Sequence, residues 1–213
     1  MSDKEPKVTY TPSDEPYLGR ELLYHFDQLI SCCLEQNALV APATHKIQLH
    51  ETQKMACQVI PQSISIALSI RELVRQGYLF GAHILKRSLI ERVMILLYIH
   101  NFPEKISIWN RGWKHNEAPS LAKMFESINN KDESGVDAKG HELTASLNSL
   151  VHGKPDSAPW NSVIMNDGQF GHAPSKMVSN PSLCDELCAD VIPWLSIIPS
   201  MICAYFPEAM PNK

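Results

Sequence analysis

The stretch "YLFGAHILKRSLIERVMILLYIHNF" (residues 78–102) decides the fold, because its apolar residues cover almost the whole circumference of a helix. Such a helix must be covered by other helices, so we expect it to be the central helix of a bundle. Lys86, Arg87, Glu91 and Arg92 interrupt the apolar run, whereas a membrane span needs about 20 uncharged residues. The stretch therefore predicts a core helix and not a membrane span.

Apolar residues recur at helical spacing through most of the remaining chain. The predicted helical segments are 17–39, 46–76, 78–101, 103–113, 119–129 and 137–152, followed by a last helix that begins at Asn180 and Pro181. We expect "APATH" (41–45) to end the first helix, Pro61 to kink or break the second, and Gly77 to stop it. The pattern predicts an all-α protein, an up-and-down helical bundle.

Residues 153–180 show no helical pattern and form a small irregular or hairpin insertion in the C-terminal third. Within it, "SVIMNDGQF" places short apolar flanks around Asp167 and Gly168, which is typical of a hairpin turn. The insertion could be a lid, a dimer-swapped arm or a surface excursion. Residues 1–16 are polar and contain three prolines, so we expect a flexible arm before a single helical domain over 17–208.

The composition limits partners and compartment. A net charge of −4 argues against non-specific binding to duplex DNA. The opening "MSDKEPKVTY" lacks the apolar run of a secretory signal, so we expect a cytoplasmic protein with reduced cysteines. Cys184 and Cys188 have no second pair or histidine at ligand spacing, so we expect buried small side chains and neither metal nor cofactor. Residues 191–206 contain two prolines and are too short to span a membrane.

One face of the predicted central helix contains several polar and ionisable side chains. On a helical wheel, His83, Arg87, Glu91 and Tyr98 fall within an arc of about 80°. Charged groups on a mostly buried helix must be paired or must line a wet cleft, because burial of an unpaired charge is costly. This face therefore indicates either an internal pair between Arg87 and Glu91 or a polar pocket, and both interpretations stay open.

A second stretch, "LNSLVHGKP" (147–155), ends a predicted helix. His152 suits the negative end of the helix dipole, Gly153 suits a left-handed cap, and Pro155 prevents continuation. Those roles alone explain the pattern. A chemical role for His152 needs partners from another helix.

The two motifs together resemble a known group. An R-x-x-x-E pattern in "LKRSLIERVMILLYI", followed some sixty residues later by "LNSLVHG", resembles uncharacterised bacterial helical proteins related to the HEPN superfamily. The resemblance covers roughly residues 60 to 155. HEPN domains are helical bundles, usually dimeric, and many are metal-independent ribonucleases in which four to six residues separate an arginine from a following histidine. Here those arginine positions hold Ala145, Ser146 and Leu147, so the arginine would have to come from the other helix.

The resemblance implies an endoribonuclease of a bacterial toxin or phage-defence system. It would act on RNA as a homodimer, with an antitoxin or defence component as a protein partner. In such a site His152 takes the proton of a 2′-hydroxyl, Arg87 contacts the phosphate and Glu91 orients one of them. We expect four further residues to contact the substrate: His83, Tyr98, Asn148 and Lys154. The alternative is a non-catalytic interaction module that binds a protein partner or a nucleotide.

Overall fold

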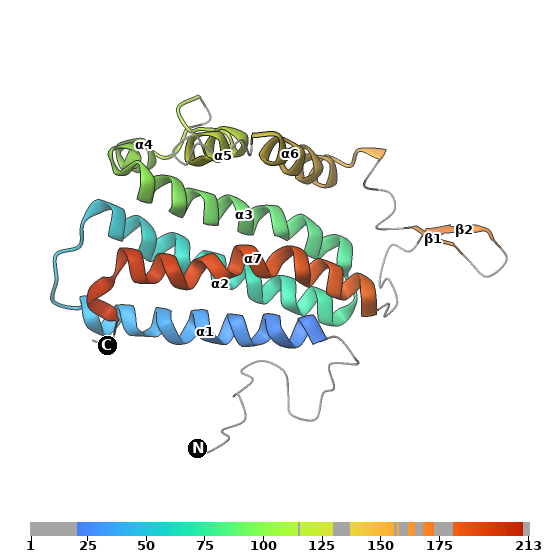
Figure 1. The fold of residues 1–213 in the computed structure, drawn as a ribbon, viewed down its shortest axis with the longest axis horizontal. Helices are drawn as coiled ribbons and strands as arrows, with labels where there is room; N and C mark the ends of the chain where they lie inside the picture. Colours follow the sequence, from blue (N-terminus) through green and yellow to red (C-terminus); the bar gives the residue numbers. More distant parts are fainter. Residues whose placement is uncertain are drawn as a thin grey trace, which may run out of the picture.

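Four long helices form the body of the molecule (Figure 1). The computed structural model describes residues 21–114, 116–129, 137–155, 157, 162–164, 168–172 and 181–210. The long helices in this part of the chain are α1 (Glu21–Thr44), α2 (Glu51–Gln76), α3 (Leu79–Asn101) and α7 (Pro181–Tyr205). The helix α2 packs on α3, and α7 packs on α1, α2 and α3. The predicted all-α helical bundle is confirmed.

The helices α1, α2 and α3 alternate in direction, and α7 joins them parallel to α3 (Figure 1). Near the start of both helices, Lys86 of α3 pairs with Asp190 of α7 at 2.6 Å. Near their ends, the Tyr205 hydroxyl of α7 donates a hydrogen bond of 2.8 Å to the carbonyl oxygen of Leu96. The chain first returns along α3 through shorter helices, so α7 starts at the same end of the bundle as α3.

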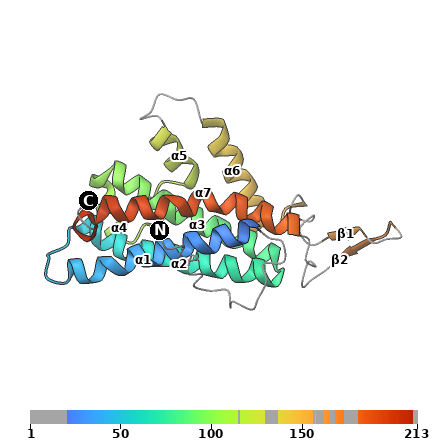
Figure 2. The same cartoon turned by 60° about the horizontal axis from the view of Figure 1, so that its bottom comes forward.

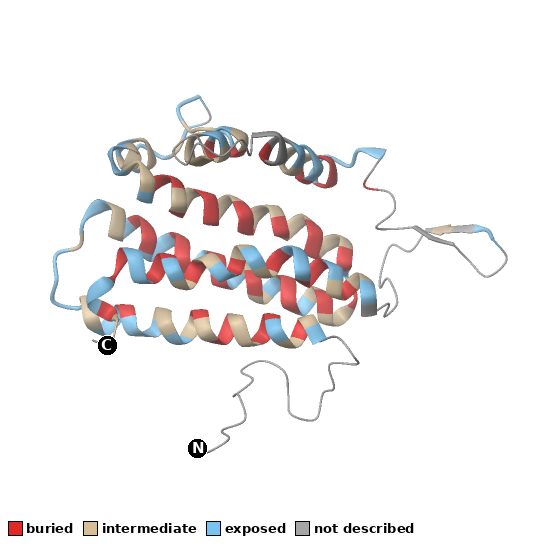
Figure 3. Ribbon diagram, viewed as in Figure 1, coloured by how far each residue is buried: buried red, intermediate tan, exposed pale blue. Residues whose placement is uncertain are grey.

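The central position of α3 is confirmed. Its side chains Leu89, Ile90, Val93 and Leu96 are all 0% exposed. Buried residues of the long helices lie where these helices face each other (Figure 3). Because α3 also carries the shorter helices on its other side, it is covered from several directions, as its apolar circumference requires.

Gly77 ends α2 as predicted. Its φ of 80° is left-handed, and the N–H groups of Gly77 and Tyr78 donate to the carbonyl oxygens of Val74 and Leu73 at 3.1 and 2.8 Å. A residue with a Cβ is strained in this conformation, which explains the glycine.

The prolines interrupt the helices less than the sequence predicts. The first helix ends within residues 41–45 as predicted, but α1 runs beyond the predicted end at residue 39 and continues through Pro42 to Thr44. Pro42 lies in the last turn, where its missing N–H removes a single helical bond. The Thr44 hydroxyl donates to the carbonyl oxygen of Val40 at 2.7 Å in the same turn. The exposed Pro61 does not break α2 either.

A second layer of short helices covers α3. It contains a 3₁₀ turn, η1 (Pro103–Lys105), and the helices α4 (Ile106–Asn110), α5 (Leu121–Asn129) and α6 (Asp137–Val151). The helices α5 and α6 pack on each other and on α3, and Figure 2 shows them as a pair on one side of the bundle. The predicted helical segments in this region are confirmed, except that α4 stops before Gly112, whose φ is 94°.

The predicted hairpin is present within the insertion. Strands β1 (Ser162–Ile164) and β2 (Phe170–His172) pair antiparallel beyond one end of the bundle (Figure 1). Gly168, before β2, has a left-handed φ of 78°. The predicted turn residue Asp167, the predicted cap Asn180 and the predicted arm over residues 1–16 lie outside the described residues.

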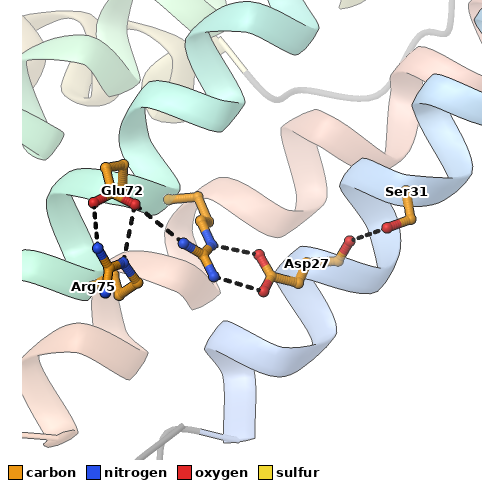
Figure 4. Close-up of polar contacts among 5 residues, drawn as sticks. Asp27, Ser31, Glu72 and Arg75 are labelled. Carbon is orange, nitrogen blue, oxygen red and sulfur yellow. Dashed lines mark hydrogen bonds and ion pairs between the residues drawn. The ribbon is translucent and has the colours of Figure 1, made fainter. Parts of the chain in front are cut away.

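A buried ion pair joins α1 to α2 (Figure 4). Arg71 Nε and Nη2 donate to the two carboxylate oxygens of Asp27 at 2.8 and 3.2 Å, and the two residues are 3% and 0% exposed. Arg71 also contacts Glu72 at 3.1 Å, and Glu72 binds Arg75 at 2.7 Å. Removal of either partner from a buried pair leaves an uncompensated charge, so this contact fixes α1 against α2 at one position.

The helix α7 is strongly apolar. Among the described residues, Ser182–Tyr205 is long and apolar enough to cross a membrane by length and composition, with a mean hydropathy of 1.7. It packs against α1, α2 and α3, and 39% of its most apolar window is buried. Cys184 and Cys188 are buried on it, as predicted. The absence of a membrane span stays a prediction.

The helix α7 leads into a last 3₁₀ turn, η3 (Pro207–Ala209), which contacts α1. Its neighbour Phe206 is 1% exposed and belongs to the hydrophobic core.

Candidate functional site

Arg87 and Glu91 form an ion pair on α3. They lie one helical turn apart, so both side chains leave the same face, and Arg87 Nε donates to Glu91 Oε1 at 2.8 Å. Their side chains are 24% and 35% exposed, so solvent reaches both. The pair that the sequence indicates is therefore present, and it is not sealed inside the bundle.

Arg87 also joins the two sequence motifs. Its Nη1 donates a hydrogen bond to Oδ1 of Asn148, which lies 61 residues further along the chain on α6. A guanidinium has five N–H donors, and these two bonds use two of them. Arg87 can therefore still donate to an anionic ligand.

An open cavity of about 480 Å³ lies between α3 and the second layer. Its lining residues come from α3, from the segment before α5, from α5 and from α6: Arg87, Glu91, Ile95, Trp113, Ala118, Pro119, Ser120, Leu121, Met124, Thr144 and Asn148. Among these, the charged side chains are Arg87 and Glu91. The cavity falls in the size range of small-ligand pockets and combines apolar walls with a few polar groups.

His152 lies one turn beyond Asn148, at the end of α6. Its side chain is exposed, and its backbone N–H donates to the carbonyl oxygen of Asn148 at 3.0 Å. Gly153 has a left-handed φ of 62°, and the Lys154 N–H donates to the Ser149 carbonyl oxygen at 3.1 Å. This is the helix end that the sequence predicts. The exposed His152 and Lys154 lie beside the cavity wall formed by α6 and do not line the cavity itself.

His83 lies on α3 in a different environment. It is 2% exposed, and burial lowers the pKa of its imidazole to about 4. The nearby Lys86 ammonium lowers this pKa further, and Asp190 of α7 opposes the effect. His83 thus faces the pair between α3 and α7 and not the cavity, although the wheel places it near Arg87.

Tyr98 also lies outside the cavity lining. It is 7% exposed, and burial raises the pKa of its hydroxyl, with a smaller contribution from Glu104. Its ring lies 5.1 Å from that of Phe102 and 6.5 Å from that of Trp113. Tyr98 therefore supports Trp113, which does line the cavity.

Of the seven predicted site residues, the structure brings three into direct contact: Arg87, Glu91 and Asn148. The wall formed by Trp113, Ser120 and Met124 was missed by sequence reasoning. Trp113 was placed at the end of the predicted helix 103–113, whereas α4 ends at Asn110. Met124 belongs to the predicted helix 119–129, and helical spacing alone does not show that one of its residues lines a cavity.

The matched family spans this whole site. Residues 53–169 match a family described as a family of unknown function (DUF5677). The match covers more than half of the 213 residues. The chain belongs to the DUF5677 family. No curated protein matches the chain, and no solved structure matches it.

The DUF5677 match begins in the first turn of α2 and ends between the two hairpin strands. It therefore includes every described residue that lines the Arg87 cavity, and it also includes His152. It leaves out α1 and α7. These two helices pack on each other and on α2, and α7 also packs on α3. The part of this chain that the family shares is the part that builds the site.

Proposed function

We propose that this chain is a metal-independent endoribonuclease that acts on single-stranded RNA at the Arg87 cavity. The observation that carries the proposal is the hydrogen bond between Arg87 and Asn148. It joins the R-x-x-x-E helix to the helix that ends at His152, beside an open cavity. The resemblance to HEPN proteins supplies the expected reaction, and the same resemblance suggests a role in a toxin or phage-defence system.

The proposed reaction uses the RNA itself as nucleophile. His152 takes the proton of a 2′-hydroxyl, and the 2′-oxygen forms a bond to the adjacent phosphorus. The bond from phosphorus to the 5′-oxygen breaks, and the leaving oxygen takes a proton from water. Arg87 donates to the phosphate oxygens as their charge grows, and Glu91 holds the guanidinium in place. The products are a 2′,3′-cyclic phosphate and a 5′-hydroxyl end.

A second candidate is a module that binds a nucleotide without cleaving it. It is favoured by the position of His152, whose backbone caps α6 and whose side chain is not part of the cavity lining. In that case Arg87, Glu91 and Asn148 bind the ligand, and His152 completes the helix end.

A cleavage assay separates the two candidates. We expect the purified chain to cleave labelled single-stranded RNA in the presence of a metal chelator and to leave cyclic phosphate ends. His152→Ala should slow cleavage about 100-fold or more, because general base catalysis typically contributes at least this much. Arg87→Ala should slow it similarly, because it removes the contact to the developing charge.

Arg92→Ala is the matched control. Arg92 lies on the same helix but binds Gln62 and the Ser88 carbonyl oxygen, away from the cavity. The Arg92→Ala variant should cleave RNA like the wild type, and circular dichroism should show that all three variants are folded. If folded wild-type protein binds RNA without cleaving it, the binding module is the correct function. If it neither binds nor cleaves RNA, the proposed endoribonuclease is wrong.

A further inference from the structure

Trp113 has an unusual backbone conformation at the wall of the Arg87 cavity. Its φ is 50°, and Gly112 before it has a φ of 94°. The left-handed region is rare for a bulky residue, because its Cβ crowds the backbone. Glycine at position 113 would adopt this conformation without strain. A strained residue at a cavity wall suggests that the side chain itself is needed there.

The indole of Trp113 is held by two other rings without being stacked by either. It lies 6.5 Å from the ring of Tyr98 at an interplanar angle of 73°, and 5.5 Å from that of Trp109 at 60°. Both arrangements are edge-on and typical of stable aromatic packing. These neighbours fix the indole while neither of them lies parallel to it.

The indole shares the cavity with the guanidinium of Arg87. Arg87 lies on the α3 side of the cavity, and Leu121 and Met124 add apolar surface near the start of α5. This combination suits a ligand that has a flat apolar ring next to an anionic group. An RNA nucleotide has this chemistry, because its base has two π-faces and its phosphate is negatively charged.

We propose that Trp113 is the stacking platform for an unpaired base whose neighbouring phosphate binds Arg87. The proposal rests on the proposed function and gives its substrate class: single-stranded RNA, with at least one base turned into the cavity. Duplex RNA is disfavoured, since its bases are already stacked on each other. Stacking tolerates different bases, so the site should have little sequence preference.

The test compares two oligonucleotides with the same number of phosphates. One is a short single-stranded 2′-O-methyl RNA, which cannot be cleaved through its 2′-oxygen, and the other is its abasic counterpart. Fluorescence anisotropy of end-labelled strands gives the affinities. Trp113→Leu should weaken binding of the base-containing strand about tenfold, which is the scale of one lost stacking contact. It should leave binding of the abasic strand unchanged.

Two further variants control for loss of structure. Trp109→Leu removes one of the rings that hold the indole but no part of the cavity lining, so it should weaken binding of the base-containing strand less than Trp113→Leu does. Trp113→Phe retains a ring and should recover most of the affinity. If Trp113→Leu has the same affinities for both strands as Trp109→Leu, the stacking role is wrong. It is also wrong if Trp113→Leu weakens binding of both strands equally.

Arg87→Ala shows which proposal has failed. It should weaken binding of both strands, because both contain the phosphate. If Arg87→Ala weakens binding and Trp113→Leu does not, the stacking role is wrong and the RNA site stands. If the folded wild type binds neither strand, the proposed function is wrong and the stacking role falls with it.

Discussion

His83 lies almost completely inside the bundle, where a charged imidazole is poorly solvated. Burial lowers its pKa to about 4, with help from Lys86 and against the effect of Asp190. In the unfolded chain its pKa is near 6.5. Between these values the unfolded chain binds more protons than the folded one, so the free energy of unfolding falls as the pH falls through this window.

We therefore predict that His83→Gln makes the stability less sensitive to acid. The wild type should lose on the order of 3 kcal/mol through this group as the pH falls from about 6.5 to about 4, and the variant should lack this loss. Urea unfolding across the window measures it. His25→Gln is the control, because that side chain is 50% exposed. Parallel stability curves for wild type and His83→Gln would contradict the prediction.

Single residues also show where the sequence was informative about the site. Arg87 and Glu91 were recognised because a one-turn spacing places any such pair in contact. His83 and Tyr98 were grouped with them because a wheel gives directions around one helix. It does not show which neighbouring helix covers each direction, and α7 covers the direction of His83.

Helix ends are decided by local conformation, so they could be predicted. Gly77 ends α2 with a left-handed φ of 80°, and Gly81 lies two residues into α3 without this requirement. A Cβ on Gly81 would meet Leu73 side-chain atoms at 3.4 and 3.9 Å, which is ordinary contact. The same substitution at the two glycines should therefore have opposite effects.

We predict that Gly77→Ala destabilises the protein by about 1 kcal/mol, because alanine is strained in the left-handed conformation. Gly81→Ala should stabilise it by about 0.5–1 kcal/mol, because alanine favours helix and loses less backbone entropy. Chemical denaturation of both variants gives the values. Equal effects with the same sign would mean that the left-handed cap is not what Gly77 provides.

Elements were less predictable where long-range packing overrides a local signal. The first helix was predicted to end at residue 39, because a proline such as Pro42 normally terminates a helix. The helix α1 instead continues past Pro42, and Val40 in the same turn is only 7% exposed. The sequence left open whether the helix that carries Arg87 contacts the helix that ends at His152. The sequence alone could not answer this, because helix pairing depends on the packing of whole faces.

The whole molecule has two layers with unequal burial. The helix α2 buries ten residues, whereas α5 buries Leu121 and Met124. The cavity lies between the layers, so its far wall belongs to the layer with fewer buried residues. Regions with few buried apolar contacts open at a lower free energy than the rest of a protein. The proposed RNA site therefore lies between α3 and a layer that we expect to open at a lower free energy.

We predict that amide hydrogen exchange is faster in α5 and α6 than in α2 and α3. Phe125→Ala should increase this difference, because Phe125 packs on Trp194 of α7 at 5.8 Å and on the backbone of α6 at Gly140. A loss of about 1.4 kcal/mol there would speed exchange in α5 and α6 about tenfold and leave α2 unchanged. Mass spectrometry of exchanged peptides resolves the two layers.

A bound oligonucleotide should slow exchange in α5 and α6, since a ligand stabilises the state that binds it. Uniform exchange across all the long and short helices would show that the layers open together.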